Sequence, residues 1–381
     1  RYIDGLFKRQ IIYGSVSFIN KEIIMYKKIY VFSPTIQATG GTELLQQLVY
    51  KLRLKGQDAY MVYTTPYQGS AVESVFGPRY NNPYIESVED NDNNIMIVSE
   101  AAMYLLLKYK NIQKAVWWLS VDFYGGSFRL PTDKLHFLFY YLSDKIYSVF
   151  DKQWIHLVQS QYAYNYCVEE RNIPLNRVYH LSDYLSKAFI DNGQNKTDAP
   201  RNNTVLFNPK KGYAFTKKLI QYAPDINWKP IQNMTSEEIA HLMKVSKVYI
   251  DFGNHPGKDR IPREAAISGC CIITGLRGAA KNDVDIPIPS GYKFEEVDLG
   301  CVVDKINDIF DHFDEHKLDF KDYVSSIKNE ESEFENQIDD VFLKSNIKVF
   351  KLSVLMQFVR ILSKYIVYAM KFGPTLFNKN N

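Results

Sequence analysis

The sequence lacks the features that mark several common protein classes. Its 381 residues include only 4 cysteines, Cys167, Cys270, Cys271 and Cys301, and no two form a Cys-x-x-Cys pair. Two of them are adjacent in an apolar segment, so we expect buried free thiols in a reducing cytoplasm rather than disulfides. The formal net charge is only +3, which argues against bulk nucleic-acid binding, because that function needs a concentrated basic face.

Long apolar runs and a dinucleotide-binding glycine motif are also missing. Residues 1–24 contain "IIYGSVSFI", which is too short to span a membrane and carries no signal-cleavage pattern. We place them outside the fold, as a foreign or upstream extension, because Met25 and the following "YKKIYVFSP" have the form of a natural start. No Gly-x-Gly-x-x-Gly follows the first predicted strand, so a dinucleotide-dependent dehydrogenase is disfavoured.

Apolar and polar segments alternate in the order typical of α/β proteins. "KIYVFSP" from Lys28 predicts a strand, and "ELLQQLVYKLRLKG" predicts a helix that ends at Gly56. The alternation predicts a mostly parallel sheet covered on both faces. Residues 191–204 are polar and lack an apolar period, which predicts a linker. Because the alternation then restarts, we expect two α/β domains, 25–190 and 205–340.

The C-terminal segment 341–381 is basic and apolar, and we expect it to be helical. In a single helix its basic residues would divide between two opposite sides, one with Lys344, Lys348 and Lys351 and the other with Arg360, Lys364 and Lys371. A helix lying on a membrane surface would keep its charges on one face. The pattern therefore favours packing against the domains. Membrane-surface contact through 346–372 is the alternative, and the two do not exclude each other.

Two basic loops are predicted at one edge of the second sheet. "NPKKG" places Lys210 and Lys211 between a strand and a helix, and "HPGKDRIPRE" places Lys258, Arg260 and Arg263 in an equivalent position. Carboxyl ends of parallel strands meet at one edge, and helix N-termini there favour anions. Together the loops predict a clamp for a diphosphate. Each loop alone could be a solvated, charged turn.

A carboxylate and two glycines accompany the predicted clamp. Glu264 follows the second basic loop, where a carboxylate commonly accepts hydrogen bonds from ribose hydroxyls. Its alternative role is a helix N-terminal charge without a ligand. Gly40 and Gly41 would let the backbone approach a ligand closely, or would form only a tight turn. Two Asp-x-Asp sequences, at Asp90 and Asp283, are present, but we expect no metal because the basic loops already neutralise a phosphate.

The residues that carry these patterns resemble a known family. "NMTSEEIAHLMKVSKVYIDFG" and "GKDRIPREAAISGCCIITG" are similar to the donor-binding half of GT-B glycosyltransferases, especially retaining family 4. "GGTELLQQLVYKLRLKG" is similar to that family's glycine loop and first helix, and "FNPKKG" to its phosphate-binding region. The resemblance spans most of 28–290. It implies two Rossmann-like domains facing a central cleft, followed by a C-terminal helical segment.

The sequence departs from the family at two places. Asn208 stands near the position of the family's usual arginine, so Lys210 or Arg260 would supply that charge. The first of the family's two glutamates, seven or eight residues before Glu264, has no clear match. Because that loop offers Lys258 and Arg260 instead, the donor sugar is expected to be unusual or acidic. The missing glutamate also motivates an alternative function, a non-catalytic GT-B-like binding or chaperone partner of another glycosyltransferase.

The resemblance implies a hexosyltransferase-type enzyme. It would transfer a sugar from a nucleotide-sugar donor to a glycan or glycolipid, with retention and without metal or other cofactor, in surface polysaccharide synthesis. We expect it in the cytoplasm, with membrane association at the inner face as an option.

The implied site residues fall into two groups. The donor group comprises Lys210, Lys211, Lys258, Arg260, Arg263 and Glu264, with Gln232 and Asn233 beside the base. The catalytic group is Asp122, which would orient or deprotonate the acceptor hydroxyl, and His255, which would donate to the leaving phosphate or the sugar. A structural cap is the alternative for Asp122, and a bystander role for His255.

Overall fold

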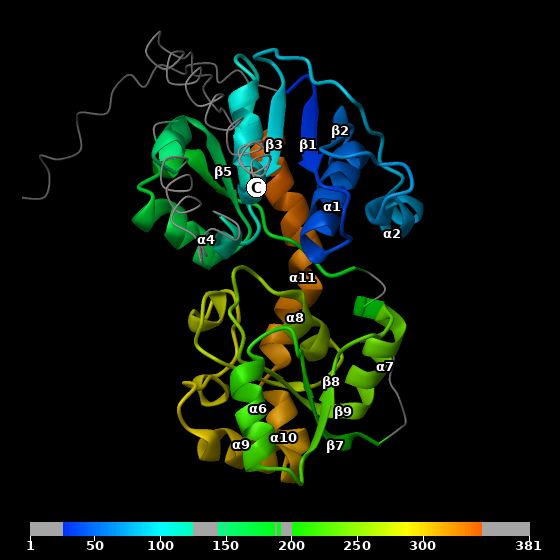
Figure 1. The fold of residues 1–381 in the computed structure, drawn as a ribbon, viewed down its shortest axis with the longest axis vertical. Coiled ribbons are helices and arrows are strands. Elements are labelled where there is room, and N and C mark those ends of the chain that lie inside the picture. Colours follow the sequence, from blue (N-terminus) through cyan, green and yellow to red (C-terminus); the bar gives the residue numbers. More distant parts are fainter. Residues whose placement is uncertain (1–25, 125–143, 149, 187–188, 192–199, 345–381) are drawn as a thin grey trace, which may run out of the picture.

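The computed structural model describes residues 26–124, 144–148, 150–186, 189–191 and 200–344. These form two α/β domains stacked along the long axis of the molecule (Figure 1). The predicted N-terminal extension, 1–24, and residues 345–381 of the predicted C-terminal segment 341–381 lie outside the described residues, whereas Val341 and Phe342 pack in the core of the first domain. Within the described part of the chain, no helix is long and apolar enough to cross a membrane.

The first domain is built on a parallel sheet of six strands in the order β2-β1-β3-β4-β5-β6. The strands are β1 (Ile29–Ser33), β2 (Ala59–Tyr63), β3 (Ile95–Ser99), β4 (Gln113–Trp118), β5 (Ile155–Val158) and β6 (Val178–His180). Alternate side chains of β1 enter two different cores, with Ile29 and Val31 in one and Tyr30 and Phe32 in the other. This two-residue period places a buried layer on each face of the sheet, as the sequence predicts.

The helices of the first domain connect these strands. The main ones are α1 (Gly40–Leu54), α2 (Ala71–Tyr80) and the short α4 (Gln161–Asn165), with 3₁₀ segments at Glu100–Lys108 (η1) and Val121–Phe123 (η2). Helix α1 begins with Thr39 as its N-cap and buries a face that contains Leu44, Leu45 and Leu48. This burial holds the N-terminus of α1 at the carboxyl edge of the sheet, where ligands of parallel sheets bind.

The second domain has a parallel sheet of four strands in the order β10-β9-β7-β8. The strands are β7 (Asn202–Phe207), β8 (Asn227–Pro230), β9 (Ser246–Asp251) and β10 (Cys271–Thr274). The helices are α6 (Tyr213–Tyr222), α7 (Ser236–Val245), α8 (Arg260–Ile267), α9 (Leu299–Asp311), α10 (Phe313–Leu318) and α11 (Lys321–Ile338). The four cysteines are free, but Cys301 is exposed on α9, contrary to the expectation that all are buried.

The domain boundaries differ from those that the sequence suggested. Tyr184 packs in the first core, whereas its neighbour Leu185 packs in the second, so the chain changes domain before residue 190. Strand β7 begins at Asn202, within the predicted linker. The chain crosses back along α11, whose Ile327 lies in the second core and whose Phe334 lies in the first (Figure 1). Polar composition marks the linker, but which core an apolar residue joins depends on tertiary packing.

Candidate functional site at the domain interface

The loop after β9 lies against the carboxyl ends of β4 and β5. Val121 N donates to Pro256 O at 2.8 Å, and Lys258 N donates to the side-chain oxygen of Gln159 at 3.0 Å. A Cβ on Gly257 would lie 2.4 Å from the carbonyl oxygen of Leu119, so only glycine permits this approach. The loop that carries the second basic motif therefore forms part of the interface between the domains.

The two predicted basic loops do meet at one edge of the second sheet. Lys211 Nζ, from the loop after β7, lies 2.6 Å from Asp259 Oδ2, from the loop after β9. Gly212 has a φ of +59° and begins α6, and a Cβ there would lie 2.3 Å from the carbonyl carbon of Phe252. This glycine allows one loop to rest on the other. Lys210, by contrast, is exposed to solvent.

Arg260 lies beside the N-terminus of α1. A Cβ on Gly40 would come within 3.0 Å of the Arg260 side chain. The guanidinium forms an ion pair with Glu43, on α1 of the first domain, and its Nε lies 3.5 Å from Glu264. Glu43 is only 4% exposed and also binds Arg79 and the hydroxyl of Tyr80, both on α2. One arginine of the second domain is therefore held between carboxylates from both domains.

The carboxylates around Arg260 differ in their tendency to ionise. Burial alone would raise the pKa of Glu43, but Arg260 and Arg79 outweigh burial and lower it below the usual range. Burial raises the pKa of Glu264, and the nearby arginines offset this only in part. Of these two carboxylates, Glu43 therefore has the stronger tendency to be ionised. The sequence gives little sign of Glu43, because it lies within an otherwise ordinary amphipathic helix.

Arg263 has a different environment from Arg260. Its side chain is completely buried, and its guanidinium lies 2.5 Å from Asp183 and 2.8 Å from Glu330. Lys258 shares Glu330, with Nζ 2.8 Å from Oε1. Asp183 directly precedes the first crossing between the domains, and Glu330 lies within α11 at the second. This placement favours a structural role for Arg263 and Lys258, in contrast to the diphosphate contact expected from the sequence.

His255 is fully buried between two carboxylates. Its Nδ1 lies 2.9 Å from Asp259, and its Nε2 lies 3.6 Å from Asp251. Burial opposes protonation, but Asp259 and Asp251 outweigh burial and raise the pKa of His255 above its ordinary value. Among the described residues this is the one trio with spacing suited to a metal ion. Because the two ring nitrogens face different carboxylates and Lys211 already pairs with Asp259, an imidazolium ion-pair network fits better.

This network gives a pH-dependent stability. The raised pKa of His255 means that its contribution is complete below pH 6.5 and is lost as the pH rises through the folded-state pKa. We expect the melting temperature to fall from pH 6.5 to 8.5 more steeply in the wild type than in His255→Gln. Differential scanning fluorimetry measures this, with exposed His241→Gln as the control. Parallel pH profiles for wild type and His255→Gln would contradict it.

Asp122 lies where the first domain meets this loop. It belongs to η2, just beyond β4, and accepts a hydrogen bond from the side-chain amide of Asn254. The hydroxyl of Tyr162 lies 3.4 Å from its other oxygen. Trp117 and Trp118 of β4 are fully buried, which agrees with core packing.

The predicted base-contacting residues and one of the two Asp-x-Asp sequences also lie in the second domain. Gln232 and Asn233 are exposed directly after β8, and Asn233 has a φ of +54°. Asp285, from one of the Asp-x-Asp sequences, accepts hydrogen bonds from Gln161 N at 2.7 Å and Tyr162 N at 2.9 Å. It therefore caps α4 of the other domain. Asp283 is exposed and pairs with Lys293.

The arrangement of two facing Rossmann-like domains can be compared with known proteins. No protein-family model matches the sequence, and no curated protein matches it. Among solved structures, Anabaena Alr3699/HepE in complex with UDP and glucose has a TM-score of 0.58 at 11% identity over 82% of this chain and 98% of that chain. The chain has the GT-B fold. This confirms the fold that the sequence resemblance implied.

Other proteins with similar structures are named for different reactions. A glycosyltransferase from Rickettsia africae has a TM-score of 0.51 at 14% identity, covering 89% of this chain and 98% of that chain. UDP-GlcNAc 2-epimerase from Neisseria meningitidis, bound to UDP-GlcNAc, also has a TM-score of 0.51, at 10% identity over 82% of this chain and 100% of that chain. Because one fold carries a transferase and an epimerase, the reaction has to be argued from the residues.

Proposed function

We propose that this protein is a glycosyltransferase that uses a nucleotide-diphosphate sugar, with a UDP-sugar as the first donor to test. The observation that carries the proposal is a group of charged side chains around the start of α8. Arg260 lies beside the N-terminus of α1 and 3.5 Å from Glu264, and Lys211 lies 2.6 Å from Asp259, the residue before Arg260. In the reaction, the bond between the sugar and the diphosphate breaks, and an acceptor hydroxyl forms the new bond. Negative charge develops on the leaving diphosphate, where fixed cations lower the barrier.

Each residue near the interface has a role in this proposal. Lys211, with exposed Lys210, binds the diphosphate, and the backbone N–H groups of Gly40 and Gly41 approach it from the first domain. Glu264 accepts hydrogen bonds from the ribose.

The remaining roles concern the base and the acceptor. Gln232 and Asn233 border the base. Asp122 faces the interface and activates the acceptor hydroxyl. His255 is too deeply buried to touch a substrate, so it acts as a positioning residue that holds Asp259 and, through it, Lys211.

Glu43 acts as a placeholder for the donor. It forms the ion pair that neutralises Arg260, and an entering diphosphate would replace it as the partner of Arg260. This exchange avoids leaving a mostly buried guanidinium unpaired before substrate arrives. In this proposal the acceptor is a glycan or glycolipid. The sequence resemblance motivates four further parts of the proposal: retention at the anomeric carbon, independence of metal, a role in surface polysaccharide synthesis, and contact with the inner membrane face.

Donor binding tests the assignment. We expect Lys211→Ala to weaken UDP binding by about 10–100-fold, because a charge-assisted hydrogen bond contributes about 1.5–3 kcal/mol. Isothermal titration calorimetry measures the affinity, and Lys217→Ala, an exposed lysine on α6, is the matched control. Equal UDP affinity in the wild type and Lys211→Ala would reject the donor site.

A second function remains to be separated from the first. The loop position seven or eight residues before Glu264 holds Pro256 and Gly257, which contact the first domain instead of presenting a carboxylate. This observation favours a non-catalytic partner protein as the alternative. Incubation with UDP-glucose and UDP-GlcNAc, followed by analysis of UDP and the sugar product, separates the two. UDP release or sugar transfer identifies an enzyme, whereas binding of a nucleotide sugar without its turnover identifies the non-catalytic protein.

A further inference from the structure

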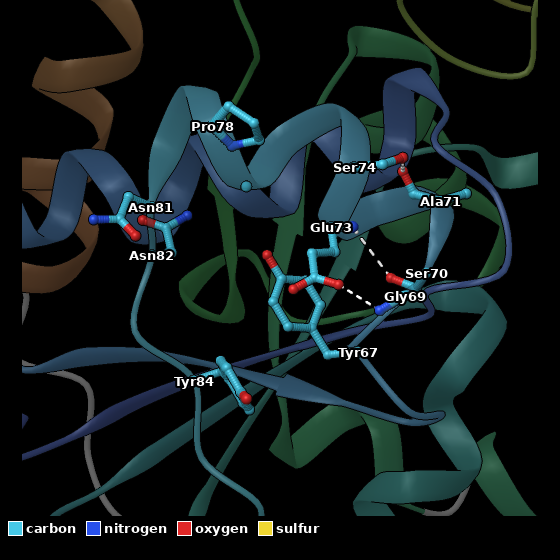
Figure 2. A pocket seen from close by; sticks show the side chains of 11 residues that line it. Tyr67, Gly69, Ser70, Ala71, Glu73, Ser74, Pro78, Asn81, Asn82 and Tyr84 are labelled. Atoms are coloured by element: carbon cyan, nitrogen blue, oxygen red, sulfur yellow. Dashed lines mark hydrogen bonds between the residues drawn. The ribbon is translucent and has the colours of Figure 1, made fainter.

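A separate surface pocket lies within the first domain. Its volume of about 680 Å³ falls within the range of roughly 300–1,000 Å³ that is common for small-molecule sites. It is formed by the loop after β2, helix α2 and the turn that follows α2 (Figure 2). All of its lining residues belong to the first domain, so it is distinct from the loops after β7 and β9.

One wall of this pocket is aromatic. The ring of Tyr67 stacks on Tyr63, with centroids 4.2 Å apart and planes at 4°, and Tyr84 tilts against Tyr67 at 5.0 Å. Tyr84 is 41% exposed. The rings support one another, so their exposed surface is held in place before any ligand binds. Such fixed rings offer an apolar surface with polar hydroxyls at the edge.

The other wall is polar and is fixed by a buried side chain. Gln46 of α1, only 3% exposed, donates from Nε2 to the Tyr63 hydroxyl at 3.0 Å and accepts from Asn82 Nδ2 at 2.8 Å. One residue therefore braces both the aromatic and the amide side of the pocket. Asn81 ends α2 with a φ of +45°, and its side chain also lines the pocket (Figure 2).

The charge of the lining selects the chemistry of the ligand. Among the described residues, Glu73 is the one charged residue that lines the pocket, and no lysine or arginine lines it. A carboxylate without a cation disfavours phosphates, sulfates and acidic sugars. Rings beside amides, hydroxyls and a carboxylate instead suit a neutral ligand with an apolar face and many hydroxyl groups.

We propose that this pocket binds neutral sugar residues of a glycan, with their C–H faces against Tyr67 and Tyr84 and their hydroxyls bonded to Glu73, Asn81 and Asn82. Its role as an acceptor subsite rests on the proposed glycosyltransferase function, whereas sugar binding itself does not. Helix α2 carries both the pocket residue Glu73 and the residues Arg79 and Tyr80 that hold Glu43. A glycan bound there is thus anchored to the helix pair that contacts Arg260.

Binding of neutral oligosaccharides tests the inference. The probes are maltotetraose, cellotetraose and chitotetraose at millimolar concentration. Saturation-transfer NMR measures their binding to the full chain. We expect at least one to bind, and its affinity to fall about tenfold or more in Tyr84→Ala and Tyr67→Ala, the effect of losing a stacking ring. Tyr222→Ala, which removes an exposed tyrosine from α6, should bind as the wild type does. Saturating UDP should not displace the sugar.

Three results would overturn the inference. These are no binding by any of the three probes, unchanged binding in the Tyr84→Ala variant, or displacement by UDP, which would identify a nucleobase pocket instead. UDP affinity measured on the same samples keeps the two proposals apart. UDP binding without oligosaccharide binding rejects only the pocket, and oligosaccharide binding without UDP binding rejects only the donor site. Melting curves confirm that Tyr67→Ala, which also loses the contact with Tyr63, remains folded.

Discussion

Replacing Arg263 with methionine is expected to lower the free energy of unfolding by about 3–5 kcal/mol, because it leaves buried Asp183 without its cation and buried Glu330 with Lys258 alone. Asp183 and Glu330 are both nearly inaccessible to water, and Asp183 has no other ion pair among the described residues. Methionine keeps most of the side-chain volume, so the loss reports on charge and hydrogen bonds rather than on a cavity. Urea unfolding measures the change.

The matched control for this experiment is Arg277→Met. Arg277 also pairs with a glutamate, Glu296, but its side chain is 56% exposed. Exposed pairs contribute about 0–1 kcal/mol, so little change is expected. The double variant Arg263→Met with Asp183→Asn should recover part of the lost stability, since it removes the uncompensated charge. If Arg263→Met is no more destabilising than Arg277→Met, the buried network does not hold the domains together.

Replacing Arg260 with glutamine is expected to lower donor turnover by roughly 100–1,000-fold, the effect of removing one fixed group that stabilises transition-state charge. Arg260 lies beside the N-terminus of α1, and its ion-pair partners among the described residues are the carboxylates of Glu43 and Glu264, which a diphosphate can replace. The measurement is UDP release from the donor that the wild type uses. Lys217→Ala again serves as the control, since its side chain is exposed on α6.

The placeholder role of Glu43 makes the opposite prediction for its own variant. Glu43→Gln should raise UDP affinity several-fold, because the diphosphate no longer competes with a carboxylate for Arg260. Tyr80→Phe removes a partner of Glu43 within the first domain and leaves the Arg260 pair in place, so it controls for local disruption. Weaker UDP binding in Glu43→Gln would mean that Glu43 positions Arg260 for the donor instead.

The fold was predictable because its signals are local. Strand and helix patterns alternate along the chain, and the helix predicted to end at Gly56 is α1, whose last residue is Leu54 and which is followed by Gly56 with a φ of +77°. The meeting of the Lys211 loop with the loop after β9 was also predictable, since parallel strands direct both loops to one edge.

The division of labour among the charged residues was not predictable. Arg260 and Arg263 are three positions apart in one short motif, and their partners decide their roles. Arg263 meets Asp183, 80 residues away, and Glu330, 67 residues away. Glu43 and Arg260 are separated by 217 residues. Such pairs depend on how the two domains face each other, which no local pattern encodes. The tyrosine pocket is another case, because Tyr63, Tyr67 and Tyr84 come together only in the folded domain.

The two crossings between the domains have a mechanical consequence. The chain passes from one core to the other at Tyr184 and Leu185, and again along α11 between Ile327 and Phe334. Arg263 connects these two crossing segments through its ion pairs with Asp183 and Glu330. Two domains that are joined by two neighbouring chain segments cannot easily slide past each other or separate. Their easiest relative motion is a rotation about the line between the two crossings. Opening of the domain interface would therefore separate Glu43 from Arg260, while the ion pairs of Arg263 with Asp183 and Glu330 remain formed.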